Sequence, residues 1–185
     1  MAEPMFLKRE PADPVGRLLY ALSRLFAYAG GLVLVALTIV SLVSIAGRAL
    51  FSAPLPGDYE LVQVGIAVSV SAFLPLTQMR GGHVIVDFFT ANARPTLRGG
   101  LDALGAALIA LCAAVIAWRL AAGAISLEQA NDQTTILALP TWIPLAIMVP
   151  CFALFAAAGA YTAWRHWAAR GRGGDDVLAH PGSGH

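Results

Sequence analysis

The stretch LVQVGIAVSVSAFLPLTQM, residues 61–79, contains no charged residue and is bounded by Glu60 and Arg80. A helix needs about 20 mostly apolar residues to cross the hydrocarbon core of a bilayer. The stretch comes close to that length, and the charges at its two ends mark where it would meet the headgroups. It therefore predicts a membrane-spanning helix.

Three other segments have the same character. One lies between Arg24 and Arg48, and another begins after Asp102 and ends near Arg119, whose long side chain we expect to extend toward the headgroups. The last falls within a long uncharged run and is expected to start near Thr141. The four predicted spans cover residues 25–47, 61–79, 100–120 and 141–164. The predicted fold class is thus an all-α integral membrane protein with four transmembrane helices.

The composition agrees with this fold class. Of 185 residues, 58% are hydrophobic and only 12% are charged, whereas a soluble domain carries about 25% charged residues. The mean hydropathy is +0.70. The net charge of +1 gives no reason to expect nucleic-acid binding. Cys112 and Cys151 lie inside apolar runs, so we interpret them as small core residues rather than as a disulfide or metal ligands.

The distribution of Lys and Arg predicts the orientation. With four spans, ten of the 12 basic residues fall on one side of the membrane, and only Arg48 and Arg119 fall on the other. The side richer in Lys and Arg is usually cytoplasmic. We therefore expect residues 1–16 to form a cytoplasmic N-terminal segment, residues 17–167 a four-helix membrane domain, and residues 168–185 a disordered cytoplasmic tail. The apolar run of the first span is too long for a typical cleaved signal peptide.

Residues near the span ends are expected to anchor the protein to membrane lipids, because Trp, Tyr, Lys and Arg favour the interface. The predicted anchors are Arg94, Arg98, Trp118, Trp142, Trp164 and Trp167. Residues 100–120 are rich in Ala and Gly, which let helices approach closely in a membrane. That pattern fits either a tightly packed four-helix unit or a face for a second membrane protein.

Ionisable residues are missing from the middle of every predicted span. Proton relays and ion sites in membranes usually depend on such residues. A small proton-driven exporter would need a carboxylate there, so the pattern argues against that class. It favours an accessory or scaffolding subunit that is not an enzyme and has no cofactor of its own.

The segment RGGHVIVDFF, residues 80–89, interrupts the apolar chain after the second span. From this point polar residues recur every three or four positions, while apolar residues fill most of the rest. The polar positions are His83, Asp87, Thr90, Arg94 and Arg98. This spacing predicts an amphipathic helix over residues 83–93 that lies in the cytoplasmic membrane interface. Gly82 and its neighbour Gly81 would allow the turn out of the span.

Arg80, His83 and Asp87 could also form a catalytic or metal site. A His–Asp pair needs a nucleophile or a metal beside it, and no second histidine lies at metal-ligand spacing in this segment. His166 would lie on the same side of the membrane, so a two-histidine site is geometrically open. We favour a structural or subunit-interface role for Arg80, Gly82, His83 and Asp87.

Two segments resemble parts of a known family. The segment GRALFSAPLPGDYELVQVGIAVSVSAFLPLTQMRGGHVIVDFF, residues 47–89, combines Arg48 after the first span, Glu60 before the second, and a Gly-His-Val-x-Val-Asp elbow. The segment LALPTWIPLAIMVP, residues 137–150, is a start of a fourth helix that contains Pro and Trp. Over roughly residues 18–167 the chain resembles the DctQ-type small membrane subunit of tripartite ATP-independent periplasmic (TRAP) transporters.

The resemblance implies a non-catalytic subunit of a secondary uptake transporter in the bacterial cytoplasmic membrane. It implies a large permease subunit that holds the substrate and sodium sites, and a periplasmic binding protein that delivers an organic acid or related solute. Arg48 and Glu60 would lie at the periplasmic rim, either paired with each other or in contact with these partners. The alternative is a membrane-anchor subunit of a redox enzyme, with haem near His83 and His166.

Overall fold

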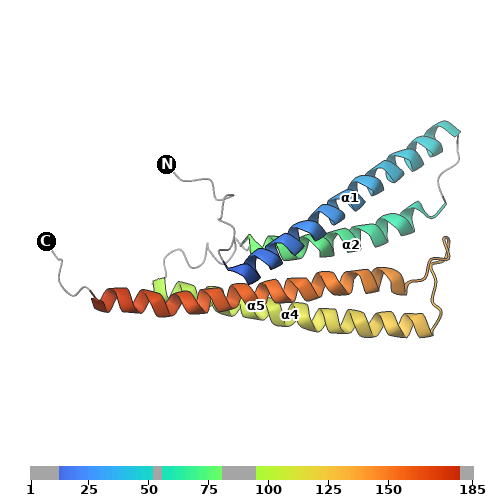
Figure 1. Ribbon diagram of the computed structural model, residues 1–185. Coiled ribbons are helices and arrows are strands. Elements are labelled where there is room, and N and C mark those ends of the chain that lie inside the picture. The colour runs from blue at the N-terminus through green and yellow to red at the C-terminus, as the bar shows by residue number, and fades with distance from the viewer. Residues whose placement is uncertain (1–12, 52–55, 81–94, 180–185) are drawn as a thin grey trace.

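The computed structural model describes residues 13–51, 56–80 and 95–179, and all regular elements in these ranges are helices (Figure 1). They are α1 (Pro14–Phe51), α2 (Asp58–Met79), α4 (Pro95–Gln129) and α5 (Trp142–Ala179). All four are long and apolar enough to cross a membrane. The prediction of an all-helical fold with four helices of this kind is confirmed.

The helices are longer than the predicted spans. With 38 residues, α1 is about 57 Å long, roughly twice the thickness of the hydrocarbon core. Helix α5 runs on to Ala179, beyond residue 164 where the fourth span was predicted to end. The expected cytoplasmic tail of residues 168–185 stays a prediction. A formed helix adds each further residue at little cost, and no proline interrupts the chain between residues 151 and 179. Residues 180–185 lie outside the described ranges.

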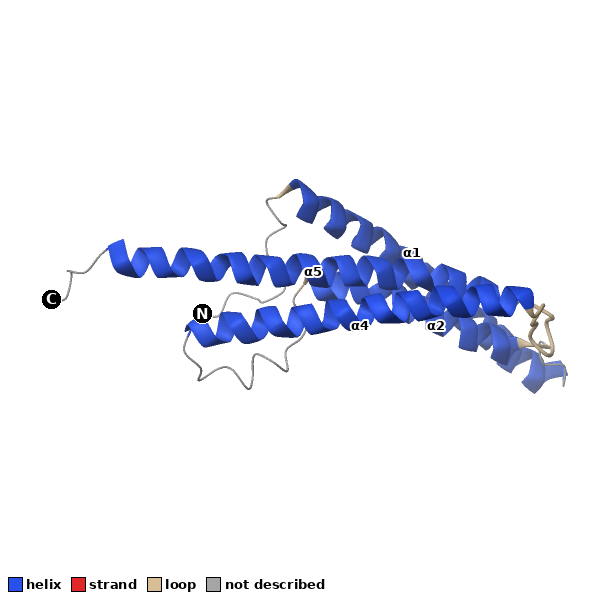
Figure 2. Cartoon of the chain, turned by 90° about the horizontal axis from the view of Figure 1, so that it is seen from below, coloured by secondary structure: helices blue, strands red, loops and turns tan. Residues whose placement is uncertain are grey.

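The four helices form an open row rather than a closed bundle (Figures 1 and 2). Helix α4 packs on α5, α5 packs on α2, and α2 packs on α1. Helix α1 also meets α5, whereas α4 contacts neither α1 nor α2. In Figure 1, α1 and α2 move apart toward the C-terminal end of α1. Among the described helices, none covers either broad face of the row.

Small residues form the seams between neighbouring helices. Among the α4 side chains whose burial the structure describes, the buried ones are Ala103, Ala106, Ala113, Ala117 and Ala124. Successive members are three, seven, four and seven residues apart, so they form one stripe along α4. This helix packs on α5. On α5, a Cβ added to Gly159 would lie 3.0 Å from the Cβ of Ala110. Close backbone approach of this kind stabilises helix pairs in membranes through van der Waals contact.

Most of the apolar surface is exposed. Only 11–22% of the residues in the apolar window of each helix are buried, which is too little for a core enclosed by the chain itself. Large side chains such as Leu32, Val35, Leu111 and Trp118 are more than half exposed. This surface is available to lipid or to another membrane subunit.

The predicted interfacial helix falls on residues 81–94, which lie outside the described ranges. It therefore stays a prediction, as do the roles of Gly82, His83, Asp87 and Arg94. Helix α4 begins directly afterwards at Pro95. Proline is favoured at the first helical position, because its missing N–H is not needed there.

Candidate functional site

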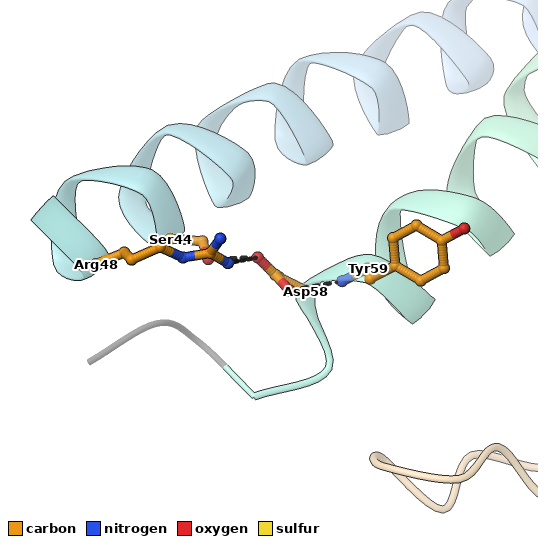
Figure 3. Close-up of polar contacts among 4 residues, drawn as sticks. All are labelled: Ser44, Arg48, Asp58 and Tyr59. Atoms are coloured by element: carbon orange, nitrogen blue, oxygen red, sulfur yellow. Dashed lines mark hydrogen bonds and ion pairs between the residues drawn. The ribbon is translucent and has the colours of Figure 1, made fainter. Parts of the chain in front are cut away.

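One end of the row, here called the loop end, holds the end of α1, the start of α2 and the loop of residues 130–141 (Figure 1). Asp58, the first residue of α2, organises the contact with α1 (Figure 3). Its carboxylate accepts a hydrogen bond from the Ser44 hydroxyl at 2.5 Å and one from the backbone N–H of Tyr59 at 2.8 Å. A carboxylate at a helix N-terminus also interacts favourably with the helix dipole.

Arg48 is a weaker participant in this cluster. Its guanidinium lies 3.9 Å from the Asp58 carboxylate, and its side chain is 67% exposed. Exposed ion pairs contribute little to stability, because water and salt screen them. Ser44, in contrast, is 1% exposed. The connection between α1 and α2 at this end therefore depends mainly on Ser44 and Asp58.

Glu60, two residues into α2, connects this helix to the loop. Its carboxylate accepts hydrogen bonds from the backbone N–H groups of Ile136 at 3.0 Å and Leu137 at 3.1 Å. The Leu137 side chain packs against Gly57, where an added Cβ would lie 2.4 Å from its Cγ. Gly57 has a φ of +79°, a conformation that glycine adopts at no steric cost. The start of α2 thus holds the loop between α4 and α5.

The loop is itself ordered by internal hydrogen bonds. The backbone N–H of Thr134 donates to the carbonyl of Leu139 at 2.9 Å, and the N–H of Leu139 donates to the Thr134 hydroxyl at 3.1 Å. Thr141 lies immediately before α5, near the residue at which the fourth span was expected to start. Its hydroxyl donates to the Asp132 carboxylate at 2.7 Å, so it connects the two ends of the loop.

Polar contacts also join the helices at the opposite end of the row, defined by Asp13, Gln78 and Thr162. The side-chain amide of Gln78 in α2 donates to the Thr162 hydroxyl in α5 at 2.9 Å. The Tyr161 hydroxyl in α5 donates to the carboxylate of Asp13, just before α1, at 3.3 Å. Gln78 is 3% exposed and Tyr161 is 8% exposed. Helix α5 is therefore connected to both α1 and α2 at this end.

The structure places Arg48 and Glu60 at the same end but gives them different partners within the chain. Arg48 lies near Asp58, and Glu60 binds the loop amides. Arg80 follows the last turn of α2, is exposed, and donates its backbone N–H to the carbonyl of Leu76. Arg98 lies in the first turn of α4. Their proposed roles in subunit contact or lipid anchoring stay predictions.

The predicted aromatic anchors lie on α4 and α5. The exposed fractions of Trp118, Trp164 and Trp167 are between 62% and 70%, and Trp142 is the half-buried first residue of α5. Exposure is what an anchor in the headgroup region requires, but anchoring itself stays a prediction.

Sequence reasoning missed the residues that make the contacts between helices. None of Ser44, Asp58, Gln78 and Thr162 was singled out from the sequence. The available signal was a polar side chain in an otherwise apolar span. Such a side chain needs a partner when it is buried, and Ser44 and Gln78 fit that description.

Metal or haem ligation receives no support from the described ranges. They contain no group of three or more His, Cys, Asp or Glu side chains that could hold a metal ion. The one histidine in these ranges is His166, half-buried on α5. His83 lies outside them, so the alternative of a redox-enzyme anchor has no observation in its favour.

Four long apolar helices and the polar contacts between them define a multi-span helical membrane protein. Residues 37–169 match the family model described as tripartite ATP-independent periplasmic transporters, DctQ component, and the chain belongs to this family. No curated protein and no solved structure matches the chain. The family match confirms the resemblance found in the sequence. The protein is thus a membrane component of a TRAP transporter and a multi-pass protein of the inner membrane.

Proposed function

We propose that this protein is the non-catalytic small subunit of a TRAP-type secondary transporter, and that it supports the large permease subunit in the membrane. The large subunit carries out ion-gradient-driven uptake of an organic acid or related solute. A periplasmic binding protein delivers that solute.

The observation that carries this proposal is the open row of helices joined at both ends. Asp58 and Glu60 connect α2 to α1 and to the α4–α5 loop at the loop end. Gln78 connects α2 to α5 at the opposite end. Contacts separated in this way hold the two helix pairs in a fixed relation, while the exposed apolar faces remain available to a partner. A fixed part of this kind is what an alternating-access transporter needs beside its moving part.

The absence of ionisable residues from the middle of the spans supports the same division of labour. A coupling-ion or proton site usually uses such groups, so we place the transport path in the large subunit.

The charge distribution supports an orientation with both termini in the cytoplasm. Most Lys and Arg residues lie toward the end opposite the loop end, in sequence positions flanking the spans. The loop end, with Asp58, Glu60 and residues 130–141, would then face the periplasm. There it could contact the large subunit or the binding protein.

The proposal is tested by deleting the chain in cells that keep the large subunit and the binding protein. We expect binding-protein-dependent solute uptake to be lost and to return when the full chain is supplied on a plasmid. The large subunit should also co-purify with the tagged full chain. Uptake that continues without the chain would refute the supporting role.

A further inference from the structure

A groove of about 710 Å³ lies between α1 and α2, a volume typical of sites that bind small organic molecules. Val35, Phe73 and Leu76 supply apolar lining, and Arg24 and Arg80 supply two guanidinium groups. The groove therefore has an apolar wall and two arginine side chains in its lining.

Both arginines lie toward the same end of the groove, because α1 and α2 are antiparallel. Arg24 precedes Val35 by 11 residues along α1, which is about 16 Å of helix. Arg80 follows Phe73 by seven residues, or about 10 Å if the helical rise is extended to it. The longer of these lengths is close to half of the roughly 30 Å hydrocarbon core. The groove thus has the dimensions of one membrane leaflet, with its charge at the headgroup level.

Local contacts determine the position of Arg24 and the width of the apolar part of the groove. The Arg24 guanidinium donates to the hydroxyl of Tyr28, another lining residue, at 3.4 Å and lies 5.7 Å from the centre of its ring. Gly31 lines the groove, and a Cβ added there would meet no atom within 4 Å. The preceding Gly30 packs closely on Ala72, where an added Cβ would lie 3.0 Å from the Ala72 Cβ. Gly30 thus lets α1 approach α2 closely, while the missing side chain at Gly31 leaves the groove open.

We propose that this groove binds one anionic phospholipid from the leaflet that meets Arg24 and Arg80. The two guanidinium groups bind the phosphate, with the planar donor geometry that suits phosphate oxygens. An acyl chain lies along Val35 and Phe73. The apolar wall favours a lipid over a soluble phosphate, because only a lipid has an acyl chain whose contact with the wall contributes to binding. The site depends only on the geometry of α1 and α2, so it stands or falls separately from the supporting role.

Native mass spectrometry of the full-length protein tests this site. Phosphatidylglycerol and phosphatidylcholine with identical acyl chains are titrated separately, and we expect phosphatidylglycerol to bind more tightly. The Arg24→Gln/Arg80→Gln variant should bind phosphatidylglycerol about 25-fold more weakly, and each single variant about fivefold more weakly. Arg119→Gln removes one exposed positive charge elsewhere, on α4, and should leave the affinity within about twofold. Equal binding of the two lipids, or an equal loss in Arg119→Gln and Arg24→Gln, would overturn the proposal.

A second pair of variants tests the apolar part without changing any charge. Gly31→Leu should fill the groove and weaken phosphatidylglycerol binding. Gly105→Leu serves as its control, because an added Cβ at Gly105 in α4 also meets no atom within 4 Å. Glycerol phosphate should fail to displace the lipid, and displacement would indicate a site for soluble phosphates instead. If the arginine variants lost the large subunit while keeping full lipid affinity, the groove would be a subunit interface and the lipid proposal would fail.

Discussion

The side chain of Gln78 in α2 donates a hydrogen bond to the hydroxyl of Thr162 in α5 across a distance of 2.9 Å. Thr162 in turn donates to the carbonyl of Gly159 within its own helix. Gln78 lies 18 residues after Glu60, or about 27 Å along α2. Helix α2 is thus connected to the α4–α5 pair at two well-separated points. The supporting role proposed for this protein depends on that relationship.

A double-mutant cycle measures the contribution of the Gln78–Thr162 hydrogen bond. We expect Gln78→Leu and Thr162→Val to show a coupling free energy of about 0.6 kcal/mol, the average for hydrogen bonds between membrane helices. Reversible unfolding in mixed micelles provides the measurement. Additive effects of the two substitutions would show that the contact contributes nothing to the packing of α2 on α5.

Loss of the Glu60 carboxylate should loosen the loop between α4 and α5. In Glu60→Ala, the amides of Ile136 and Leu137 lose their acceptors, and we expect them to exchange with deuterium roughly ten times faster. Glu128→Ala is the matched control, because Glu128 is an exposed glutamate near the end of α4. Hydrogen-exchange mass spectrometry of the peptide that covers residues 130–141 makes the comparison. Equal exchange in the two variants would show that Glu60 does not hold the loop.

The seam between α4 and α5 should tolerate no side chain at Gly159. A Cβ there would lie 3.1 Å from the Cα and 3.2 Å from the N of Ala110, and backbone atoms cannot rotate away. We expect Gly159→Leu to destabilise the protein by at least about 1–3 kcal/mol, the cost of overpacking. Gly105→Leu, at an open position of α4, should melt close to the wild-type temperature. Similar melting temperatures for both variants would contradict the close approach.

At the loop end, Ser44 should matter more for stability than Arg48. Ser44 is buried and donates directly to Asp58, whereas Arg48 is exposed and lies 3.9 Å away from the same carboxylate. We therefore expect Ser44→Ala to lower the melting temperature more than Arg48→Gln does, because removing a buried partner leaves polar atoms unsatisfied. Raising the salt concentration should change the Arg48→Gln difference more than the Ser44→Ala difference. A larger loss of stability in Arg48→Gln would reverse this ranking.

The four membrane helices could be predicted because hydropathy and helix length are local properties of the chain. Residues 61–79 already carry this information, as does the family resemblance at residues 47–89 and 137–150. The helix ends were less predictable, since a helical backbone continues past the hydrocarbon core wherever nothing interrupts it. Helix α5 shows this by running to Ala179.

The contacts between helices could not be predicted from periodicity. Gln78 and Thr162 are 84 positions apart, and neither residue indicates which helix will lie beside its own. The sequence did place Arg48 and Glu60 at one end of the molecule. It could not show that Ser44 would reach Asp58, or that Glu60 would accept hydrogen bonds from the backbone of a distant loop. The partner of each of these side chains depends on which helices lie next to each other in the row.

A cross-link at the loop end tests most directly whether this protein is the fixed part of the transporter. Cys112 and Cys151, the free cysteines of the described ranges, are first replaced by alanine. Glu60→Cys and Ile136→Cys are then joined by a short bifunctional thiol reagent, which replaces the native contact between Glu60 and the Ile136 amide. Binding-protein-dependent uptake is measured before and after cross-linking. We expect uptake to be retained or increased, because α2 and the α4–α5 loop do not need to move apart. Loss of uptake on cross-linking, with recovery when a cleavable linker is cut, would contradict the supporting role.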